Sequence, residues 1–512
     1  MTDAAKADLQ GATLWDALLQ ARARHGGKKL ILEDADRKPL SYDDLIRAAF
    51  ALSRKLKPLT TPGERVGLLL PTSVGCVVSF FALHTLGCTP VMLNFTATPK
   101  TVRAAMAVAG VKRVLSAKRF IQQAKLEELA AEVEADAAMT WLDEVRKTIG
   151  TPDKLYALTA GFLPRRFLPR EHRDDPGVIL FTSGSFGAPK AVVLSQANLT
   201  ANPRQIARHI ALDPAWTMFN PLPTFHSFGL TAGVFVPLLN GLRSFQYPSP
   251  LHVKQIPRLV RESGAAVLFG TDTFANQYAR AAEPGDLDSL LFLVCGAEKV
   301  RPETQKLYGA TPVLEGYGAT ECSPVIAVNH PDRNRPGTVG QLLPGVEPRL
   351  EPVDGIPEGG RLFVRGPNIM AGYLGPDGRP EPPPGGWHDT GDVAAIDAEG
   401  MVRLLGRLKR FAKVAGEMVS LGAVEELAAK LWPDGRHAVM AAPDTKKGER
   451  LILVTERLDA DLPALAAFAK KEGAPEIAVP RRVIHVHHLP LLGSGKLDYG
   501  ALQVLAEQQA TA

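Results

Sequence analysis

Short apolar runs rich in β-branched and aromatic residues recur along this chain, and longer amphipathic segments separate them. Examples are Arg65–Leu70 (RVGLLL), Val178–Phe181 (VILF), Ala266–Phe269 (AVLF) and Leu291–Val294 (LFLV). The intervening segment Ile256–Ser263 has the periodicity of a helix with one apolar face. Such alternation is typical of α/β proteins, in which helices cover largely parallel sheets. The sequence therefore predicts layered α/β sheets for most of the chain.

The pattern changes in the C-terminal third. From about Pro344, the stretch PGVEPRLEPVDGIPEGGRLFVRG predicts hairpins and hence a small β-rich subdomain. The Pro-rich stretch Pro380–Gly386 is expected to be an irregular surface loop. After Arg407 the chain has helix and strand signals of its own. We therefore expect a large N-terminal domain over residues 1–406 and a small α+β C-terminal domain over residues 407–512.

Composition and charge limit the function classes. The chain has 512 residues, of which 45% are hydrophobic and 22% charged, a balance typical of globular proteins. Lys and Arg total 59 and Asp and Glu total 54, which leaves a formal net charge of only +5. This near neutrality gives no reason to expect a nucleic-acid partner, and any basic docking surface must be local.

The cysteines and the N-terminus indicate a cytoplasmic protein. Cys76, Cys88, Cys295 and Cys322 show no C-x-x-C spacing, so neither a zinc site nor a disulfide framework is predicted. The first residues lack the apolar run of a secretory signal. Polar residues interrupt the apolar window Val77–Phe95, which predicts a buried helix followed by a strand rather than a membrane span.

The strongest local signal is Thr182–Lys190, TSGSFGAPK, which directly follows the predicted strand VILF. Its glycines, hydroxyls and lysine can surround phosphate oxygens with backbone N–H groups and one positive charge. It is not a P-loop, because that pattern requires a Lys-Ser or Lys-Thr pair that opens a helix. Taken alone, the segment could also be a simple Gly/Ser turn between two strands. The later stretch Gly493–Lys496 (GSGK) also lacks the P-loop pattern and predicts no second nucleotide loop.

Further motifs follow in a fixed order: PTFHSFG, GAE, GYGATE, DTGD, GRLKRFAKVAGEMVS and LLGSGKLD. Together with TSGSFGAPK, they resemble the motifs of the adenylate-forming superfamily of acyl-CoA synthetases, luciferases and adenylation domains. That resemblance implies a large N-terminal domain with a small mobile C-terminal domain, and ATP and Mg²⁺ as cofactors. Phe186 departs from the superfamily pattern, which usually has a small hydroxyl residue there.

The resemblance implies a set of nucleotide-binding residues spread over six motifs. They are Thr182, Ser183, Gly184, Ser185, Gly187, Lys190, Gly296, Ala297, Glu298, Gly316, Tyr317, Gly318, Thr320, Asp392, Arg407 and Lys496. Tyr317 offers a π-face for adenine, Thr320 a hydroxyl for a phosphate, and Glu321 an oxygen ligand for Mg²⁺. Asp392 can accept hydrogen bonds from both ribose hydroxyls, and Arg407 can approach the same sugar. Taken alone, these residues would also fit ordinary buried turns.

The catalytic residues implied by the resemblance are Lys496, Thr320, Glu321, His226 and Lys413. His226 is expected at the mouth of the acyl pocket, although a histidine between phenylalanines is more often a packed core residue. Lys496 would stabilise the charge that develops during adenylation. Lys409 corresponds to a hinge about which the small domain rotates, so that the face around Lys413 and Gly416 replaces Lys496 for thioester formation.

A narrower resemblance covers nearly the whole chain, from about Thr13 to Leu505. Segments such as LFGTDTF, GPNIMAGYL and RFAKVAGEMVSL are similar to the ligase half of bacterial bifunctional acyltransferase/acyl-carrier-protein synthetases. This similarity implies a long-chain fatty acid as substrate and acyl carrier protein as thiol acceptor, with CoA as the alternative. No histidine has an aspartate five positions later, so we expect a ligase without the acyltransferase activity.

Several alternatives stay open. Leu230, Val234, Phe235 and Leu238 have helical spacing and could line an acyl pocket, but core packing explains them equally well. A non-catalytic nucleotide-binding scaffold is a second function class, for which Phe186 is the only indication.

Two surfaces are candidates for partners. Arg481 and Arg482, with other C-terminal cations, could dock an acidic carrier protein. The segment Lys154–Arg170 (KLYALTAGFLPRRFLPR) mixes apolar side chains with arginines and could lie at a membrane surface through Phe162, Leu163 and Phe167. Its prolines make a buried connector an equal alternative. We therefore expect a cytoplasmic enzyme with at most peripheral contact to the inner face of the membrane.

Overall fold

The computed structural model describes residues 11–183, 189–414, 417–444, 448–490 and 497–510. Two compact units can be distinguished by their internal packing. The N-terminal unit comprises residues 1–347 and 365–388, and the C-terminal unit comprises residues 348–364 and 389–512. Residues 348–364 and 389–406 thus pack with the smaller unit, whereas the sequence prediction ended the large domain at residue 406. The hinge near Lys409 stays a prediction.

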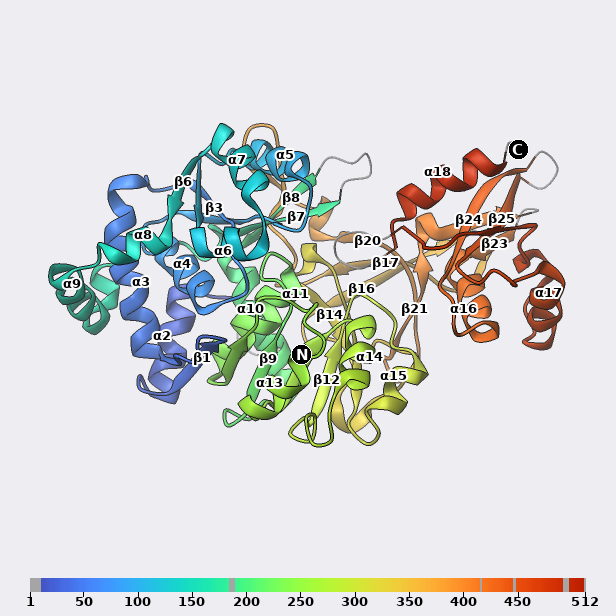
Figure 1. Cartoon of the computed structure of the whole chain (residues 1–512), viewed down its shortest axis with the longest axis horizontal. Helices are drawn as coiled ribbons and strands as arrows, with labels where there is room; N and C mark the ends of the chain where they lie inside the picture. The colour runs from blue at the N-terminus through green and yellow to red at the C-terminus, as the bar shows by residue number, and fades with distance from the viewer. Residues whose placement is uncertain (1–10, 184–188, 415–416, 445–447, 491–496, 511–512) are drawn as a thin grey trace. The chain divides into compact units, whose positions relative to one another are not determined.

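A nine-stranded sheet forms one layer of the N-terminal unit (Figure 1). In spatial order its strands are β15 (Gln341–Leu342), β14 (Val325–Val328), β13 (Val313–Gly318), β12 (Phe292–Cys295), β11 (Val267–Gly270), β9 (Thr217–Asn220), β10 (Arg243–Gln246), β1 (Leu30–Asp34) and β2 (Leu40–Ser41). The strands from β13 to β1 run parallel, and antiparallel strands complete both ends.

An eight-stranded sheet forms the second layer of the N-terminal unit. Its strands are β19 (Pro380–Glu381), β18 (Gly372–Leu374), β8 (Pro189–Ser195), β7 (Pro176–Ser183), β4 (Thr89–Met92), β3 (Arg65–Leu68), β5 (Arg113–Ser116) and β6 (Ala138–Trp141). The strands from β7 to β6 are parallel, whereas β8 and β18 are antiparallel additions. The two sheets confirm the predicted α/β class, and β3, β7, β11 and β12 coincide with predicted strands.

Helices cover and connect these sheets. In the N-terminal unit they are α2 (Leu14–His25), α3 (Tyr42–Leu56), α4 (Val74–His84), α5 (Pro99–Ala109), α6 (Lys118–Ala124), α7 (Glu127–Asp136), α8 (Leu142–Lys147), α9 (Thr151–Phe162), α10 (Gln196–His209), α11 (Ser227–Leu230), α12 (Val236–Asn240), α13 (Ile256–Ser263), α14 (Asp272–Ala281) and α15 (Pro302–Leu307). Local sequence sets their ends: Ser41 and Asp44 form a reciprocal capping box at the start of α3. The predicted helix–strand pair in the window Val77–Phe95 is confirmed as α4 and β4.

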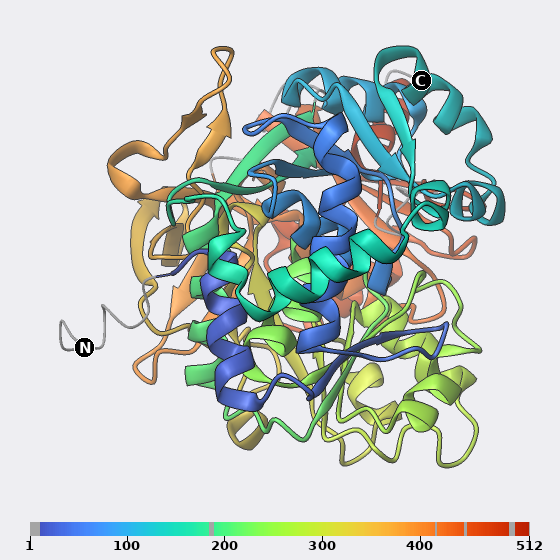
Figure 2. The same ribbon diagram turned by 90° about the vertical axis from the view of Figure 1, so that its left-hand side faces the viewer.

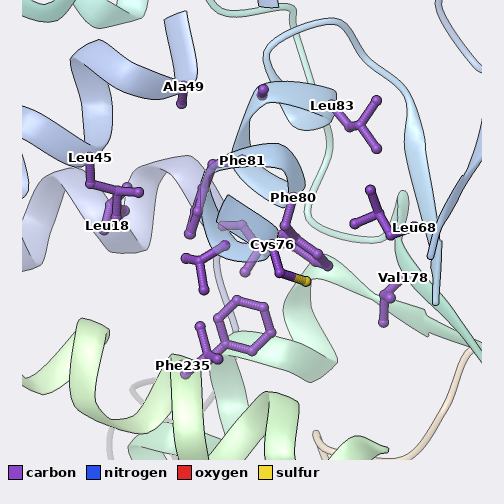
Figure 3. Close-up of a cluster of buried hydrophobic side chains, with 14 of the residues drawn as sticks. Leu18, Leu45, Ala49, Leu68, Cys76, Phe80, Phe81, Leu83, Val178 and Phe235 are labelled. Atoms are coloured by element: carbon purple, nitrogen blue, oxygen red, sulfur yellow. The ribbon is translucent and has the colours of Figure 1, made fainter. Parts of the chain in front are cut away.

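The main core lies among α2, α3, α4 and the apolar faces of β3 and β7. Figure 3 shows Phe80 and Phe81 of α4 packed with Leu18, Leu45 and Phe235. The rings of Phe80 and Phe235 meet edge to face with centroids 5.5 Å apart. The apolar stripe after His226 also belongs to this core, because Leu230, Val234, Phe235 and Leu238 are at most 3% exposed. Core packing, the alternative left open above, therefore accounts for the stripe.

The C-terminal unit contains two sheets. The first pairs β16 (Glu347–Val353), β17 (Ile356–Arg365), β20 (His388–Ile396) and β21 (Val402–Arg407). The second contains β23 (Glu417–Ser420), β22 (Phe411–Val414), β25 (Gly448–Thr455), β24 (His437–Asp444) and β26 (Arg482–His485). Its helices are α16 (Leu421–Leu431), α17 (Leu462–Lys471) and α18 (Tyr499–Ala510). The predicted hairpins after Pro344 are confirmed, since only Asp354 and Gly355 separate β16 from β17.

Two further findings concern predictions about the surface and the cysteines. The stretch Pro380–Gly386 is not an irregular loop, because it contains β19 and the 3₁₀ turn Pro384–Gly386. All four cysteines are buried and free, and the sequence had predicted no disulfide framework. Within the described parts of the chain, we find no helix with the length and apolar character needed to cross a bilayer.

Candidate functional site

The phosphate-loop motif spans the connection between the antiparallel strands β7 and β8, and its first and last residues belong to these strands. Thr182 pairs with Lys190, and Ser183 with Pro189, so the residues on both sides of the motif face each other across the two strands. The motif residues Gly184, Ser185, Phe186, Gly187 and Ala188 lie outside the described residues. Lys190 is exposed, and its ammonium nitrogen lies 5.0 Å from the centre of the Tyr373 ring. This distance is typical of a cation–π interaction.

Tyr373 joins this lysine to the predicted metal ligand. It lies on β18, which pairs with β8 so that Tyr373 stands opposite Val192. Its hydroxyl donates a hydrogen bond to Glu321 Oε1 over 2.7 Å. A single side chain therefore contacts the phosphate-loop cation through its ring and the carboxylate through its hydroxyl.

The turn that carries Thr320 and Glu321 is fixed through its backbone. It is a 3₁₀ turn, η4 (Thr320–Cys322), directly after β13. Met370 N donates to Glu321 O over 2.8 Å, and the Asn368 amide donates to Cys322 O over the same distance. These bonds hold the turn in place and leave the Glu321 side chain partly exposed.

The PTFHSFG segment approaches the same turn. Ser227 Oγ donates a hydrogen bond to Thr320 Oγ1 over 3.3 Å, which brings two hydroxyls together next to Glu321. His226 is exposed, and its ring lies 4.7 Å from that of the buried Phe225. It is therefore not a packed core residue. Its role as a gate to the acyl pocket stays a prediction.

The GAE motif follows β12. Gly296 packs against Phe228 so closely that a Cβ atom would lie 3.0 Å from Phe228 Cε1. Ala297 has a φ of 68°, an unusual left-handed conformation for a residue with a side chain. The Glu298 carboxylate accepts a hydrogen bond from Thr273 N, over 3.0 Å, in the first turn of α14. In this conformation Glu298 thus stabilises a helix start, and its nucleotide contact stays a prediction.

The GYG part of GYGATE forms the end of β13. Gly316, Tyr317 and Gly318 pair with β14, and Tyr317 is only 8% exposed. A side chain at Gly318 would meet the backbone, since a Cβ atom there would lie 2.1 Å from Pro324 O. The glycine therefore allows the close approach of two strands just before the Thr320 turn. Stacking of adenine on Tyr317 stays a prediction.

Asp392 and Arg407 meet within the C-terminal unit. They occupy paired positions on β20 and β21, and Arg407 Nε lies 3.4 Å from Asp392 Oδ1. The Asp392 side chain is 10% exposed and that of Arg407 is 77% exposed. The predicted proximity of these two residues is therefore present, and their contact with a ribose stays a prediction.

The predicted hinge lies in the 3₁₀ turn η7 (Leu408–Arg410). Arg410 is anchored: its guanidinium donates to Glu425 Oε1 and Val439 O and lies 3.9 Å from the centre of the Tyr499 ring. Lys409 thus lies between Arg407, which is close to Asp392, and Arg410, which is bonded to Glu425. Lys413 is exposed on β22, and Lys496 and Gly416 lie outside the described residues.

Sequence reasoning missed two residues of this site. Ser227 lies inside the PTFHSFG motif next to His226, but the motif indicated a role for the histidine alone. Tyr373 belongs to GPNIMAGYL, yet no local pattern connects it with Lys190 or Glu321. Only the pairing of β18 with β8 brings it to them.

Comparisons with known proteins identify the family of the chain. The family model described as AMP-binding enzyme matches residues 19–374, more than half of the chain. The chain is 26% identical over 438 residues to a long-chain-fatty-acid–CoA ligase of Yersinia pestis, which covers 78% of this chain and 77% of that protein. It is 28% identical over 501 residues to a feruloyl-CoA synthase of Amycolatopsis sp, with 94% of each covered.

The fold also matches a solved structure, that of O-succinylbenzoate coenzyme A synthetase from Bacillus subtilis in complex with ATP and magnesium ion. The TM-score is 0.79 at 21% sequence identity, and the match covers 94% of this chain and 98% of that one. At this identity the likeness concerns the fold. With the family match over residues 19–374, the chain belongs to the AMP-binding enzyme family of the adenylate-forming superfamily.

Proposed function

We propose that this chain is an AMP-forming ligase that activates a fatty acid with ATP and transfers the acyl group to the thiol of CoA. The observation that carries the proposal is the contact of Tyr373 with both Lys190 and Glu321. A cation and a carboxylate held by one side chain suit a triphosphate and its metal ion. The named relatives, a fatty-acid–CoA ligase and a feruloyl-CoA synthase, support an organic acid as substrate and CoA as acceptor.

The residues of the N-terminal unit fit a magnesium–nucleotide complex. Among the described residues, no group of three or more His, Cys, Asp and Glu side chains could hold a metal ion by itself. Mg²⁺ is commonly held by one or two carboxylates together with substrate phosphates. Glu321 would be that carboxylate, and the ion would neutralise charge on the triphosphate. Thr320 and Ser227 would supply hydroxyls, and Lys190 a positive charge, to phosphate oxygens.

The proposed reaction has two half-reactions. In the first, the carboxylate of the fatty acid attacks the α-phosphate of ATP, and pyrophosphate leaves with the electrons of the broken P–O bond. Lys496 is the proposed cation for the charge that grows on these oxygens. In the second, the CoA thiol gives up its proton and attacks the acyl carbonyl, and AMP leaves. The proposed hinge at Lys409 would exchange Lys496 for the face around Lys413 between the two steps.

The acceptor is the point at which this proposal departs from the sequence prediction. Acyl carrier protein was predicted from the narrower resemblance. The named relatives are CoA ligases, which favours the alternative acceptor, CoA. Of the predicted docking residues for a carrier protein, Arg482 is the first residue of β26 in the C-terminal unit, and Arg481 directly precedes it. A role for them in carrier-protein docking stays a prediction.

The decisive test measures both half-reactions on one purified protein. We expect fatty-acid-dependent exchange of pyrophosphate into ATP, followed by acyl-CoA formation that exceeds acyl-carrier-protein formation at equal acceptor concentrations. A panel of acids from short to long chains, with ferulate as an aromatic control, would identify the substrate class. Absence of exchange with every acid would contradict the ligase and favour the non-catalytic scaffold. Preferential acylation of the carrier protein would restore the acceptor predicted from the sequence.

A further inference from the structure

Helix α9 packs on the protein mainly with its small residues and exposes two leucines and a phenylalanine. Its buried positions are Asp153, Ala157, Ala160 and Gly161. Helix α3 covers this small-residue face: a Cβ atom at Gly161 would lie 3.1 Å from Arg47 Cγ. Asp153 is held from α3 as well, with Lys55 Nζ 2.8 Å and Arg54 Nε 3.3 Å away. The helix is therefore firmly attached without the use of Leu155, Leu158 and Phe162, although Tyr156 packs partly buried against the core.

Those large side chains form an apolar strip in solvent. Leu155 is 64% exposed, Leu158 52% and Phe162 81%, and Leu163, just after the helix, is 41% exposed. At about 100° per residue, Leu155, Leu158 and Phe162 lie within about 60° of one another on the helix surface. Figure 2, which views the N-terminal unit from this side, shows α9 on the outside of α3. An exposed apolar strip of this kind marks an interaction site more often than chance.

Basic residues flank the strip, and no acidic residue lies in the stretch Lys154–Arg170. Lys154, Arg165, Arg166 and Arg170 are all exposed. Arg165 Nη2 lies 3.2 Å from Asp16 Oδ1, yet the arginine side chain stays 72% exposed and can meet another anion. The other aromatic residue predicted for the contact, Phe167, is partly buried and packs against Phe50 and Tyr156. Phe167 is therefore not available for a membrane contact, whereas the exposed Leu155 and Leu158 are available.

We propose that the outer face of α9 and the following turn η2 (Pro164–Arg166) bind an anionic membrane surface. The helix would lie parallel to the membrane, with Leu155, Leu158, Phe162 and Leu163 among the acyl chains and the cations at the headgroups. A protein partner is less well matched, because a standard interface covers roughly 800 Å² per partner and the strip is one helix face wide. The proposal does not depend on the substrate, because its test measures binding to lipid.

The test is sedimentation of the full chain with vesicles of equal parts phosphatidylcholine and phosphatidylglycerol, with pure phosphatidylcholine vesicles for comparison. We expect binding to the anionic vesicles that falls with added salt. Leu158→Ser combined with Phe162→Ser should lower partitioning at least about tenfold, since each substitution removes the free energy gained when that apolar side chain is buried among the acyl chains. Arg165→Gln with Arg166→Gln should lower it about 25-fold, since each lost cation weakens binding roughly fivefold.

The matched control is Leu251→Ser, because Leu251 is 68% exposed elsewhere on the same unit. It should bind like the wild type, and all variants should keep the thermal midpoint of the wild type, since the altered side chains are exposed. In a second measurement, the emission of Phe162→Trp should shift to the blue on addition of anionic vesicles. Equal sedimentation of wild type and the Leu158/Phe162 variant would overturn the proposal. So would an emission shift with an acidic carrier protein but not with vesicles, which would identify the strip as a protein-docking site.

Discussion

At the residue scale, Tyr373 has an unusual combination of contacts. Its hydroxyl donates to the Glu321 carboxylate, and its ring lies beside the Lys190 ammonium group. The neutral Tyr373 side chain therefore contacts both of these oppositely charged groups and helps to fix their positions. Such preorganisation lowers the cost of ordering the site when a charged substrate binds.

The first prediction concerns the Tyr373 hydroxyl. Tyr373→Phe removes the bond to Glu321 and keeps the ring beside Lys190. A hydrogen bond to a charged group contributes about 1.5–3 kcal/mol, so we expect the magnesium concentration for half-maximal adenylation to rise about tenfold. The apparent affinity for ATP at saturating magnesium should change little. Initial rates of pyrophosphate exchange measured against magnesium concentration check this.

Tyr373→Leu is the comparison variant, because it removes the hydroxyl and the aromatic ring together. It should weaken ATP binding in addition, through the lost contact with Lys190. If Tyr373→Phe keeps the magnesium dependence of the wild type, the hydroxyl has no part in holding the metal ligand.

At the element scale, strand pairing determines which motifs can meet. The phosphate-loop motif lies between two antiparallel strands, and β18 is added beside them. The Thr320 turn follows β13 of the other sheet. The site residues of the N-terminal unit therefore come from both sheets. The register of the short strand β18 against β8 determines which residues Tyr373 can contact.

This dependence explains which predictions the sequence could support. Buried parallel strands such as β3 and β12 are continuous apolar runs, so their positions follow from composition alone. The short strand at Pro380–Glu381 has no such signature and was predicted as a loop. The contact of Tyr373 with Lys190 depends on strand order, which no local pattern encodes. Asp392 and Arg407 were both expected near the same ribose, so their proximity agrees with that expectation. The distance of 3.4 Å between Arg407 Nε and Asp392 Oδ1 could not be predicted.

The second prediction concerns the hinge. Arg407 is tied to Asp392 and Arg410 to Glu425, so a rotation about η7 must be absorbed by the residues between them. Lys409→Pro restricts φ at this position and disfavours the helical conformation of Leu408. We expect pyrophosphate exchange to continue and thioester formation to fall at least about tenfold, an order-of-magnitude expectation for a blocked closure step.

The complementary variant is Lys496→Ala, which should abolish adenylation yet still convert supplied acyl-adenylate to thioester. Lys409→Ala is the control for loss of charge alone and should keep both activities. The hinge proposal fails if Lys409→Pro forms thioester at the normal rate, or if Lys496→Ala loses both activities in equal proportion.

The third prediction concerns the pH dependence of the C-terminal unit. His437 on β24 is buried and hydrogen-bonded to Thr455 Oγ1 and Trp432 O, and burial lowers its pKa. The folded unit therefore disfavours the proton that the unfolded chain takes up near pH 6.5. The stability that the neutral imidazole provides is complete above pH 6.5 and is lost as the pH falls toward the lower pKa of the folded state.

The variant His437→Gln isolates this effect from other titrating groups, among them Glu425, whose pKa is raised by burial. Amide hydrogen exchange in peptides from β24 and β25, compared at pH 7.5 and 5.5 after correction for the intrinsic rate, should show less acid-induced destabilisation in the variant. The exposed His488, replaced by Gln, is the control. An identical response of wild type and His437→Gln would show that another group causes the acid sensitivity.

At the scale of the whole molecule, the chain has two compact units with separate cores. The cluster around Phe80 and Phe81 stabilises the N-terminal unit, and a cluster around Val424 and Leu453 stabilises the C-terminal unit. The predicted hinge at Lys409 lies inside the C-terminal unit, so the boundary between the two units is not the boundary of the predicted rotation.

The buried cysteines have a consequence for a protein that handles thiol substrates. All four are free and at most 2% exposed, and burial raises the pKa of the Cys76 and Cys88 thiols to about 11. Thiolates carry out disulfide exchange, so these protonated, shielded sulfurs cannot readily form mixed disulfides with oxidised CoA. The native protein should react with Ellman's reagent at least about a hundredfold more slowly than the urea-unfolded chain, since ordinary thiols titrate near pH 8.5. Rapid labelling of native protein would contradict this. If labelling of the native protein is slow, as expected, the cysteines can serve as reporters of unfolding, and an air-oxidised preparation should keep its activity without a reducing agent.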